Sequence, residues 1–395
     1  MKMILLLLSF ILIASCSHNS VDVKNGLIIF EQSKSYPVKH LKISDIADVN
    51  FIKLNTPDSI LLYHPGAIKG TYIDENNIII SDCPMDESSF VVYRFDNFGN
   101  YMNRISRYGR GPGEVSQRAK IFYEGDSTLF LYSGFDSKLT AVNINGDFIR
   151  TYYITQGHTE LEIMDDEVLI YDQLSQYESN KRMTYRGEPL RAFYLSQSEP
   201  VIRLSEPTDI LLSNEHASYI DCDKMIKSSP VFTRNKDGVY MSSLRFDTIY
   251  HINNNLHITP KIVVKKTLQS DEYYTILPLI ETDKYLIFKE DPDRYSSLKC
   301  AHSHYIFIKA ENKIYRIHNN LNPGTMKFLD FKRLVLDDEI CISPNFLTLN
   351  SNVLAIYFTS EEINELYEYL TPELKTLSNN ITDNDNPLLM VITFH

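Results

Sequence analysis

A repeated pattern of short apolar runs and polar turns is the feature that most constrains how this chain folds. From residue 60 onward, each unit begins with an Asp, Asn or Gly turn and continues with short alternating runs, which further polar turns separate. Gly99 and Gly146 occupy the same point of two consecutive units, each between alternating runs. Glycine turns in this position are typical of β-hairpins. The chain is therefore predicted to form a series of small antiparallel sheets.

The size of the repeat predicts a β-propeller. Each unit has three or four predicted strands in about 50 to 60 residues, and six such units match a six-bladed propeller. Strand-like runs also lie near both ends of the chain, at 27–30, 50–54 and 387–394. An N-terminal strand that completes the last blade would close the ring and remove exposed sheet edges.

Two short helices are predicted near the C-terminus, inserted between strands of the last blade. Thr359 and Glu362 have the spacing of a capping box, and apolar residues follow at helical spacing. Pro372, a residue tolerated at the first helical position, begins the second helix. The predicted fold class is all-β, with a six-bladed propeller over residues 25–395 as a single domain.

The first residues predict export. Lys2, the apolar run at 4–13 and the small residues before Cys16 are the parts of a secretory signal peptide. The run is too short for the roughly twenty residues of a membrane-spanning helix. Ile-Ala-Ser-Cys also resembles a bacterial lipoprotein cleavage box, which implies a signal peptide at 1–15, lipid on Cys16 and a polar tether at 16–24. The alternative is an ordinary signal peptide with an incidental cysteine.

Composition excludes one class of partner and leaves the cysteine chemistry open. A net charge of −12 repels nucleic acid, so no nucleic-acid partner is expected. An exported protein can form disulfides, but the spacing of the other four cysteines fits neither a dense disulfide scaffold nor a zinc site. They are expected to be buried or unpaired thiols, with one bridge as the alternative. These residues are Cys83, Cys222, Cys300 and Cys341.

The sharpest motif is a Gly-rich segment at 107–114, with the sequence Arg-Tyr-Gly-Arg-Gly-Pro-Gly-Glu. Its glycines lack the spacing of a dinucleotide loop, and it has no P-loop lysine. Arg107 and Arg110 are the candidate ligand-binding residues, since arginine can hold a carboxylate or phosphate at the mouth of the ring. The rest of the segment is predicted to be a structural turn between blades, formed by Gly109, Gly111, Pro112, Gly113 and Glu114.

The same segment resembles a string found in the Bacteroidota family of six-bladed β-propeller lipoproteins, which includes TolB-like members. That string joins F-D-x-x-G to G-R-G-P-G-E, here at 95–99 and 109–114, and the segments at 247–250 and 385–388 are similar to further strands of the family. The resemblance implies a propeller in the cell envelope. The residues after Cys16 lack the acidic cluster of many surface-exported lipoproteins, which favours a periplasm-facing position.

Other polar residues are weaker candidates for a site. His302 and His304 face one side of a predicted strand and could bind a metal, but no third ligand is identifiable. Acidic residues at 165–167, 291–293 and 337–339 are predicted to form turns rather than ligand or catalytic groups. No cofactor is predicted, although calcium stays open.

The sequence predicts a monomeric binding or scaffolding module for a glycan, peptide or protein partner, attached to the membrane through Cys16. No catalytic motif occurs, which favours this function over an enzyme. The alternative is a calcium-dependent hydrolase or lyase that resembles propeller lactonases. Its acidic ligands would come from several blades and meet at the central channel.

Overall fold

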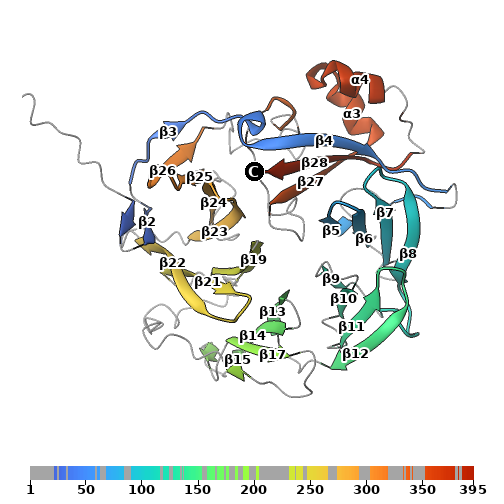
Figure 1. The fold of residues 1–395 in the computed structure, drawn as a ribbon, viewed down its shortest axis with the longest axis horizontal. Coiled ribbons are helices and arrows are strands. Elements are labelled where there is room, and N and C mark those ends of the chain that lie inside the picture. Colours follow the sequence, from blue (N-terminus) through green and yellow to red (C-terminus); the bar gives the residue numbers. More distant parts are fainter. Residues whose placement is uncertain are drawn as a thin grey trace, which may run out of the picture.

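The computed structural model shows a ring of small β-sheets, in which each large sheet has one edge strand near the centre (Figure 1). The structure describes residues 22–24, 26–32, 34–57, 60–62, 68–83, 90–115, 119–123, 128–133, 136, 138–153, 158–164, 167–172, 175–177, 183–185, 190–194, 202–203, 231–235, 237–242, 247–265, 274–292, 303–318, 332, 335–338, 340, 352–378, 381 and 385–395. This arrangement confirms the prediction of an all-β, propeller-like fold.

Three of the large sheets follow one another along the chain. The first contains β5 (Ile68–Ile73), β6 (Asn77–Asp82), β7 (Val91–Asp96) and β8 (Tyr101–Arg107). The second contains β9 (Lys120–Tyr123), β10 (Thr128–Ser133), β11 (Lys138–Asn143) and β12 (Phe148–Tyr153). The third contains β13 (His158–Met164), β14 (Glu167–Asp172), β17 (Leu190–Tyr194) and β18 (Ile202–Arg203), beside a separate hairpin of β15 (Ser175–Tyr177) and β16 (Met183–Tyr185).

The remaining sheets each include strands from the N-terminal region. The fourth contains β19 (Val231–Asn235), β20 (Gly238–Ser242), β21 (Thr248–Asn253) and β22 (Ile258–Lys265), with β2 (Leu27–Glu31) and β1 (Val23–Lys24) added. The fifth contains β23 (Tyr274–Glu281), β24 (Tyr285–Pro292), β25 (Ser303–Ile308) and β26 (Lys313–Ile317), with β3 (Val38–Lys39) added. A last, three-stranded sheet has the order β27 (Val353–Phe358), β28 (Leu388–Phe394) and β4 (Ala47–Lys53).

The predicted number of six blades is wrong. Among the described residues, five sheets have four or more strands, and the sheet at the C-terminal end has three. The reason is that the last repeat supplies only two strands, β27 and β28, and the chain between them forms helices. These are α3 (Ser360–Glu365), the 3₁₀ turn η5 (Tyr367–Tyr369) and α4 (Pro372–Ser378), which lie outside the ring (Figure 1).

The predicted capping box forms at the start of α3. The Thr359 Oγ1 accepts from the Glu362 backbone N–H at 3.2 Å, and the Glu362 carboxylate accepts from the Thr359 N–H at 2.9 Å. The buried Lys332 ammonium also donates to this carboxylate, at 2.6 Å. In the described part of the chain, no helix has the length and apolar character needed to cross a membrane.

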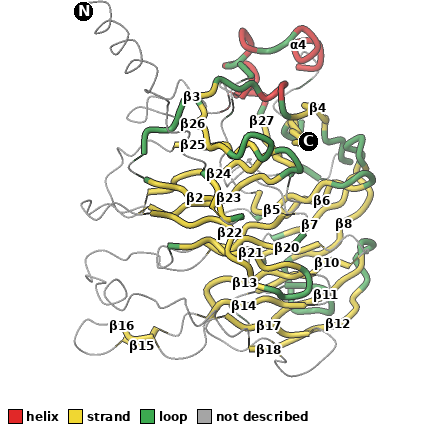
Figure 2. The backbone as a smooth tube through the Cα atoms, turned by 60° about the vertical axis from the view of Figure 1, so that its left-hand side comes forward, coloured by secondary structure: helices red, strands yellow, loops and turns green. Residues whose placement is uncertain are grey.

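Residues 22–55, which we call the N-terminal strap, run along the outer strands of neighbouring sheets. β2 pairs in parallel with β22, β3 pairs in parallel with β26, and β4 pairs antiparallel with β28. Figures 1 and 2 both show β3 beside β26. Beyond β4, Asn55 bridges to Asn100 at the start of β8. The strap thus contacts four sheets, three of which are far from it in sequence.

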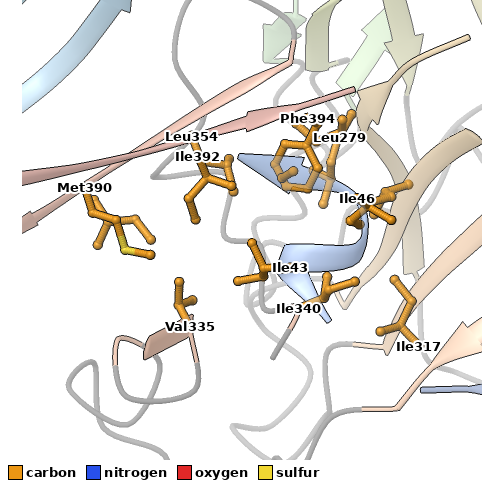
Figure 3. Packing of buried hydrophobic residues seen from close by; sticks show 14 of the residues in the cluster. Ile43, Ile46, Leu279, Ile317, Val335, Ile340, Leu354, Met390, Ile392 and Phe394 are labelled. Carbon is orange, nitrogen blue, oxygen red and sulfur yellow. The ribbon is translucent and has the colours of Figure 1, made fainter. Parts of the chain in front are cut away.

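Apolar side chains of the strap are part of the core. Its 3₁₀ turn η1 (Ile43–Asp45) places Ile43 and Ile46 in a cluster with Leu354, Ile392 and Phe394 of the last sheet (Figure 3). Burial of such side chains is the main source of stability in a sheet whose strands are distant in sequence. The strap is therefore an integral part of the ring.

Candidate functional site

The Gly-rich segment forms a compact loop directly after β8. The Gly109 N–H donates to Val115 O at 2.8 Å, and the Val115 N–H donates to Arg107 O at 3.1 Å, which closes the loop at its base. The Ser106 hydroxyl donates to Gly113 O at 2.6 Å. These hydrogen bonds satisfy backbone N–H and C=O groups within the loop and so fix its conformation.

The side chain of Glu114 organises this loop from within. Its carboxylate accepts from the Gly111 N–H at 2.9 Å and from the Arg107 Nε at 2.7 Å. These two hydrogen bonds hold the pKa of Glu114 below its usual range, and the bond from the Gly111 backbone has the larger effect. A Cβ atom on Gly109 would lie 2.0 Å from the Glu114 Oε2, so a larger residue there would displace this carboxylate. Both predicted ligand-binding arginines are exposed, but Arg107 pairs with Glu114 of the loop.

Gly113 has a φ of +76°, a conformation that side chains other than glycine rarely adopt. A Cβ at this position would also lie 3.3 Å from Val142 Cγ1 in the next sheet. We expect Gly113→Val to lower the free energy of unfolding by about 1–3 kcal/mol through backbone strain, as measured by thermal or urea unfolding.

The matched control for this prediction is the double change Arg107→Ala and Arg110→Ala. Both guanidinium groups are exposed, so their loss should cost less than about 1 kcal/mol. A tolerated Gly113→Val would show that the loop does not need its positive φ. The ligand-binding role of the two arginines stays a prediction.

The loop lies against β12, the outer strand of the second sheet. A Cβ on Gly113 would be 3.7 Å from the Phe148 Cβ, so the loop is in contact with the start of β12. Large side chains are exposed on the loop and on β12: Tyr108 by 43%, Phe148 by 44%, Ile149 by 52% and Tyr153 by 79%. With Arg110 and Arg150, both exposed, these residues make up what we call the loop–β12 surface.

The loop–β12 surface has the composition of a protein-binding site. Aromatic residues and arginine are enriched where partners contribute most binding energy. Cations lie close to its rings, with the Arg150 guanidinium 5.1 Å from the centroid of Tyr152 and the Lys138 Nζ 6.0 Å from that of Tyr153. Among the described residues, β12 pairs only with β11, so its outer edge also offers backbone groups. The surface combines apolar contact area, positive charge and an open strand edge.

The sequence predicts a strand at 148–154, but sequence reasoning did not find that its side chains are exposed, although a signal for this exists. A half-buried strand alternates apolar and polar residues, because successive side chains point to opposite faces. In β12, Phe148 and Ile149 are consecutive apolar residues, and so are Tyr152 and Tyr153. Apolar residues on both faces of an outermost strand indicate that some of them meet solvent or a partner.

Charged residues on inner strands connect three neighbouring sheets. Lys120 on β9 donates from Nζ to Leu161 O at 2.9 Å, and Arg234 on β19 donates from Nη1 to Ile163 O at 3.2 Å. Both accepting carbonyls belong to β13 of the third sheet. The same strand carries Glu162, whose carboxylate lies 4.0 Å from the Lys120 Nζ and 3.8 Å from the Arg234 Nη1. These ion pairs hold neighbouring inner strands together.

Glu281, the last residue of β23, joins the fourth and fifth sheets. Its carboxylate accepts hydrogen bonds from Lys309 at 2.9 Å, from Asn235 at 3.0 Å and from the Tyr240 hydroxyl, and Lys261 lies 3.4 Å away. Burial raises the pKa of this carboxyl, but the bonds from Lys309 and Tyr240 and the charge of Lys261 outweigh it. The resulting pKa is about 2. The cluster is therefore an ionised structural link.

The other sequence candidates are only partly within the described residues. His304 is buried in β25, while His302 lies outside the described residues, as do Cys16, Cys222, Cys300 and Cys341. Cys83 is buried in the core, as predicted for the thiols. Asp338 lies in a turn, as predicted, and accepts from the Ser44 N–H at 2.8 Å and hydroxyl at 2.6 Å, which fastens the strap. Within the described ranges, no three or more His, Cys, Asp or Glu side chains are grouped so that they could hold a metal.

Comparisons with known proteins show one matching family and similar solved structures. The model of one family, described as "Domain of unknown function (DUF4934)", matches residues 27–393. The solved structure of a Bacteroides fragilis protein, named as an exported protein, is 14% identical with a TM-score of 0.59 and covers 93% of this chain and 99% of its own. A member of the DUF4221 family from Bacteroides vulgatus is 12% identical, with a TM-score of 0.48 and coverage of 89% and 97%. No curated protein matches the sequence.

Proposed function

We propose that this chain, which belongs to the DUF4934 family, is a cell-envelope β-propeller that binds or scaffolds a protein partner through the loop–β12 surface. The observation that carries this proposal is the exposure of Phe148, Ile149 and Tyr153 on one outer strand, which also carries the exposed Arg150 and contacts the loop that contains Arg110. Exposed apolar side chains that gather on one element can mark a protein-interaction site. The partner segment is expected to be apolar and acidic, so that it complements the rings and the two guanidinium groups.

The proposed membrane anchor would leave the loop–β12 surface accessible to a partner. Asp22, where the described chain begins, is fixed at the rim because its carboxylate accepts from the Ile314 N–H at 3.0 Å and pairs with Lys34. A lipid on Cys16 would lie six residues earlier, which is at most about 20 Å of extended chain. The rim at β2 would then face the membrane, and β12, on the other side of the ring, would face away from it (Figure 1).

In the same proposal the strap closes the ring, and the protein resembles the TolB-like lipoproteins in carrying lipid at its N-terminus. Support for closure comes from the antiparallel pairing of β4 with β28, which runs from Lys53 opposite Leu388 to Ala47 opposite Phe394. The similar Bacteroides fragilis protein is named as an exported protein, which supports a location in the envelope.

Photo-crosslinking in intact cells that produce the protein tests the binding surface. A benzophenone amino acid placed at Ile149 or Tyr153 should give a discrete adduct with a second protein. The matched control is Val38, which is similarly exposed at 54% but lies on the strap. Adduct yield at Ile149 should fall when Arg110 and Arg150 are both changed to glutamate. Equal adducts at Val38 and Ile149, or none at Ile149 and Tyr153, would contradict a partner site on β12.

The anchor has its own test. Cys16→Ser should move the protein from the membrane fraction to the soluble fraction or leave the signal peptide uncleaved, since acylation requires the cysteine thiol. Membrane fractionation and mass spectrometry of the N-terminal peptide measure this. A Cys16→Ser protein that is still lipidated would contradict the anchor without affecting the crosslinking result.

A further inference from the structure

Two histidines lie side by side where the strap meets the fifth sheet. β3 and β26 run in parallel, with Arg316 opposite Val38 and Ile317 opposite Lys39. His318 and His40 are the next residues of the two strands, and their ring centroids are 4.3 Å apart with an angle of 42° between the planes. Both side chains are exposed.

We propose that His40 and His318 together bind one first-row divalent transition metal, such as Zn²⁺, Ni²⁺ or Cu²⁺. Metal-bound imidazole nitrogens lie about 2.0–2.1 Å from the ion, which places the centroids of two adjacent ring ligands about 4.5–5 Å apart. The observed 4.3 Å is close to this value, so a small side-chain rotation brings both rings onto one ion. Water fills the other coordination positions.

The backbone holds the two ligands in place before any metal arrives. The His318 N–H donates to Lys39 O at 3.0 Å, and the Arg316 N–H donates to Pro37 O at 3.0 Å, which fixes the register of the strands. A preorganised pair binds more tightly than two independent histidines, because less conformational entropy is lost.

The charge of the neighbouring Lys39 does not oppose the metal. Consecutive residues of a strand point to opposite faces, so Lys39 points away from the face of His40. Its Nζ lies 3.4 Å from the Glu311 carboxylate and 4.7 Å from the ring centroid of Tyr315. The cation is therefore already neutralised on the other side of the sheet.

The site has a structural consequence. A bound ion joins a strap residue to the end of β26 and so cross-links the N-terminal region to the fifth sheet. Two imidazoles favour Cu²⁺ over Ni²⁺ and Zn²⁺ and do not select Mg²⁺ or Ca²⁺, which prefer oxygen ligands. This site is thus distinct in chemistry from a calcium centre in the channel.

Thermal unfolding of the full chain, purified without a histidine tag, tests the proposal. A molar excess of Zn²⁺ or Ni²⁺ should raise the melting temperature by about 2 °C or more, because a ligand that binds only the folded state stabilises it. Ca²⁺ should cause no such rise. His40→Ala and His318→Ala should each abolish the rise and leave the metal-free melting temperature nearly unchanged, because both side chains are exposed.

His257→Ala is the matched control, since His257 is also exposed but has no histidine beside it among the ring contacts of the described residues. It should keep the full metal response. Electron paramagnetic resonance of one equivalent of Cu²⁺ should show coupling to two imidazole nitrogens in the wild type and to fewer in either single variant. A metal response that survives in His40→Ala, or that is lost in His257→Ala, would overturn the site.

Discussion

Replacing Phe30 with alanine is expected to lower the free energy of unfolding by about 3–5 kcal/mol. Phe30 is fully buried in the strap, where its ring stacks on Tyr36 at 5.3 Å. It also makes edge contacts with Phe288 at 5.3 Å and Tyr305 at 4.8 Å, both in the fifth sheet. Truncation removes these contacts and leaves a cavity that neighbouring strands cannot easily fill.

Chemical denaturation of the purified protein measures this effect, with Val38→Ala as the matched control. Val38 belongs to the same strap but is 54% exposed, so its truncation should change stability by less than about 0.5 kcal/mol. If Phe30→Ala lowered the free energy of unfolding as little as Val38→Ala is expected to, the packing of Phe30 would add no stability.

Glu281→Gln is expected to cost about 3 kcal/mol at neutral pH. The pKa of this carboxyl is about 2 in the folded state, against about 4.3 for a free glutamate, and each unit of difference corresponds to about 1.4 kcal/mol. Because the folded pKa is the lower one, the carboxylate stabilises the fold fully above pH 4.3. This contribution is lost as the pH falls from about 4.3 to about 2.

The stability difference between wild type and Glu281→Gln should therefore shrink over that pH range, as measured by urea unfolding at a series of pH values. Glu31→Gln is the control, since Glu31 pairs with Lys265 at the surface, where such a pair contributes less than about 1 kcal/mol. A difference that stays constant between pH 7 and pH 2 would show that the ionisation of Glu281 is not coupled to folding.

Local features of the ring could be predicted from the sequence because their causes are local. Gly99 and Gly146 form the predicted turns with φ values of +84° and +93°, and the capping box at Thr359 forms as its spacing indicates. The Gly-rich segment is also a compact turn, with Glu114 as its internal acceptor. In each case a few consecutive residues determine the backbone.

The strap and the number of blades depend on contacts that no local pattern encodes. The run at 27–30 was predicted as a strand, but nothing in it specifies that Ile28 pairs in parallel with Ile262. The close approach of Lys53 O to Gly99, where a Cβ would be 2.2 Å away, likewise depends on the folded ring. The exposure of Phe148 was missed for the same reason, because burial is decided by neighbouring sheets.

The order in which the strap and its partners are synthesised has a consequence for folding. The strap precedes every strand of the other sheets that it pairs with. Ile28 can pair only after Ile262 has been synthesised, and Ala47 only after Phe394 near the other end of the chain. Such high contact order slows folding, because long segments must be ordered before these pairs form. The hairpins of the first sheets can assemble as they emerge, whereas the pair of β4 with β28 forms only after residue 394 has been synthesised. Nascent chains would therefore hold their N-terminal strands unpaired during most of synthesis, and unpaired strand edges of this kind favour aggregation until their partners are made.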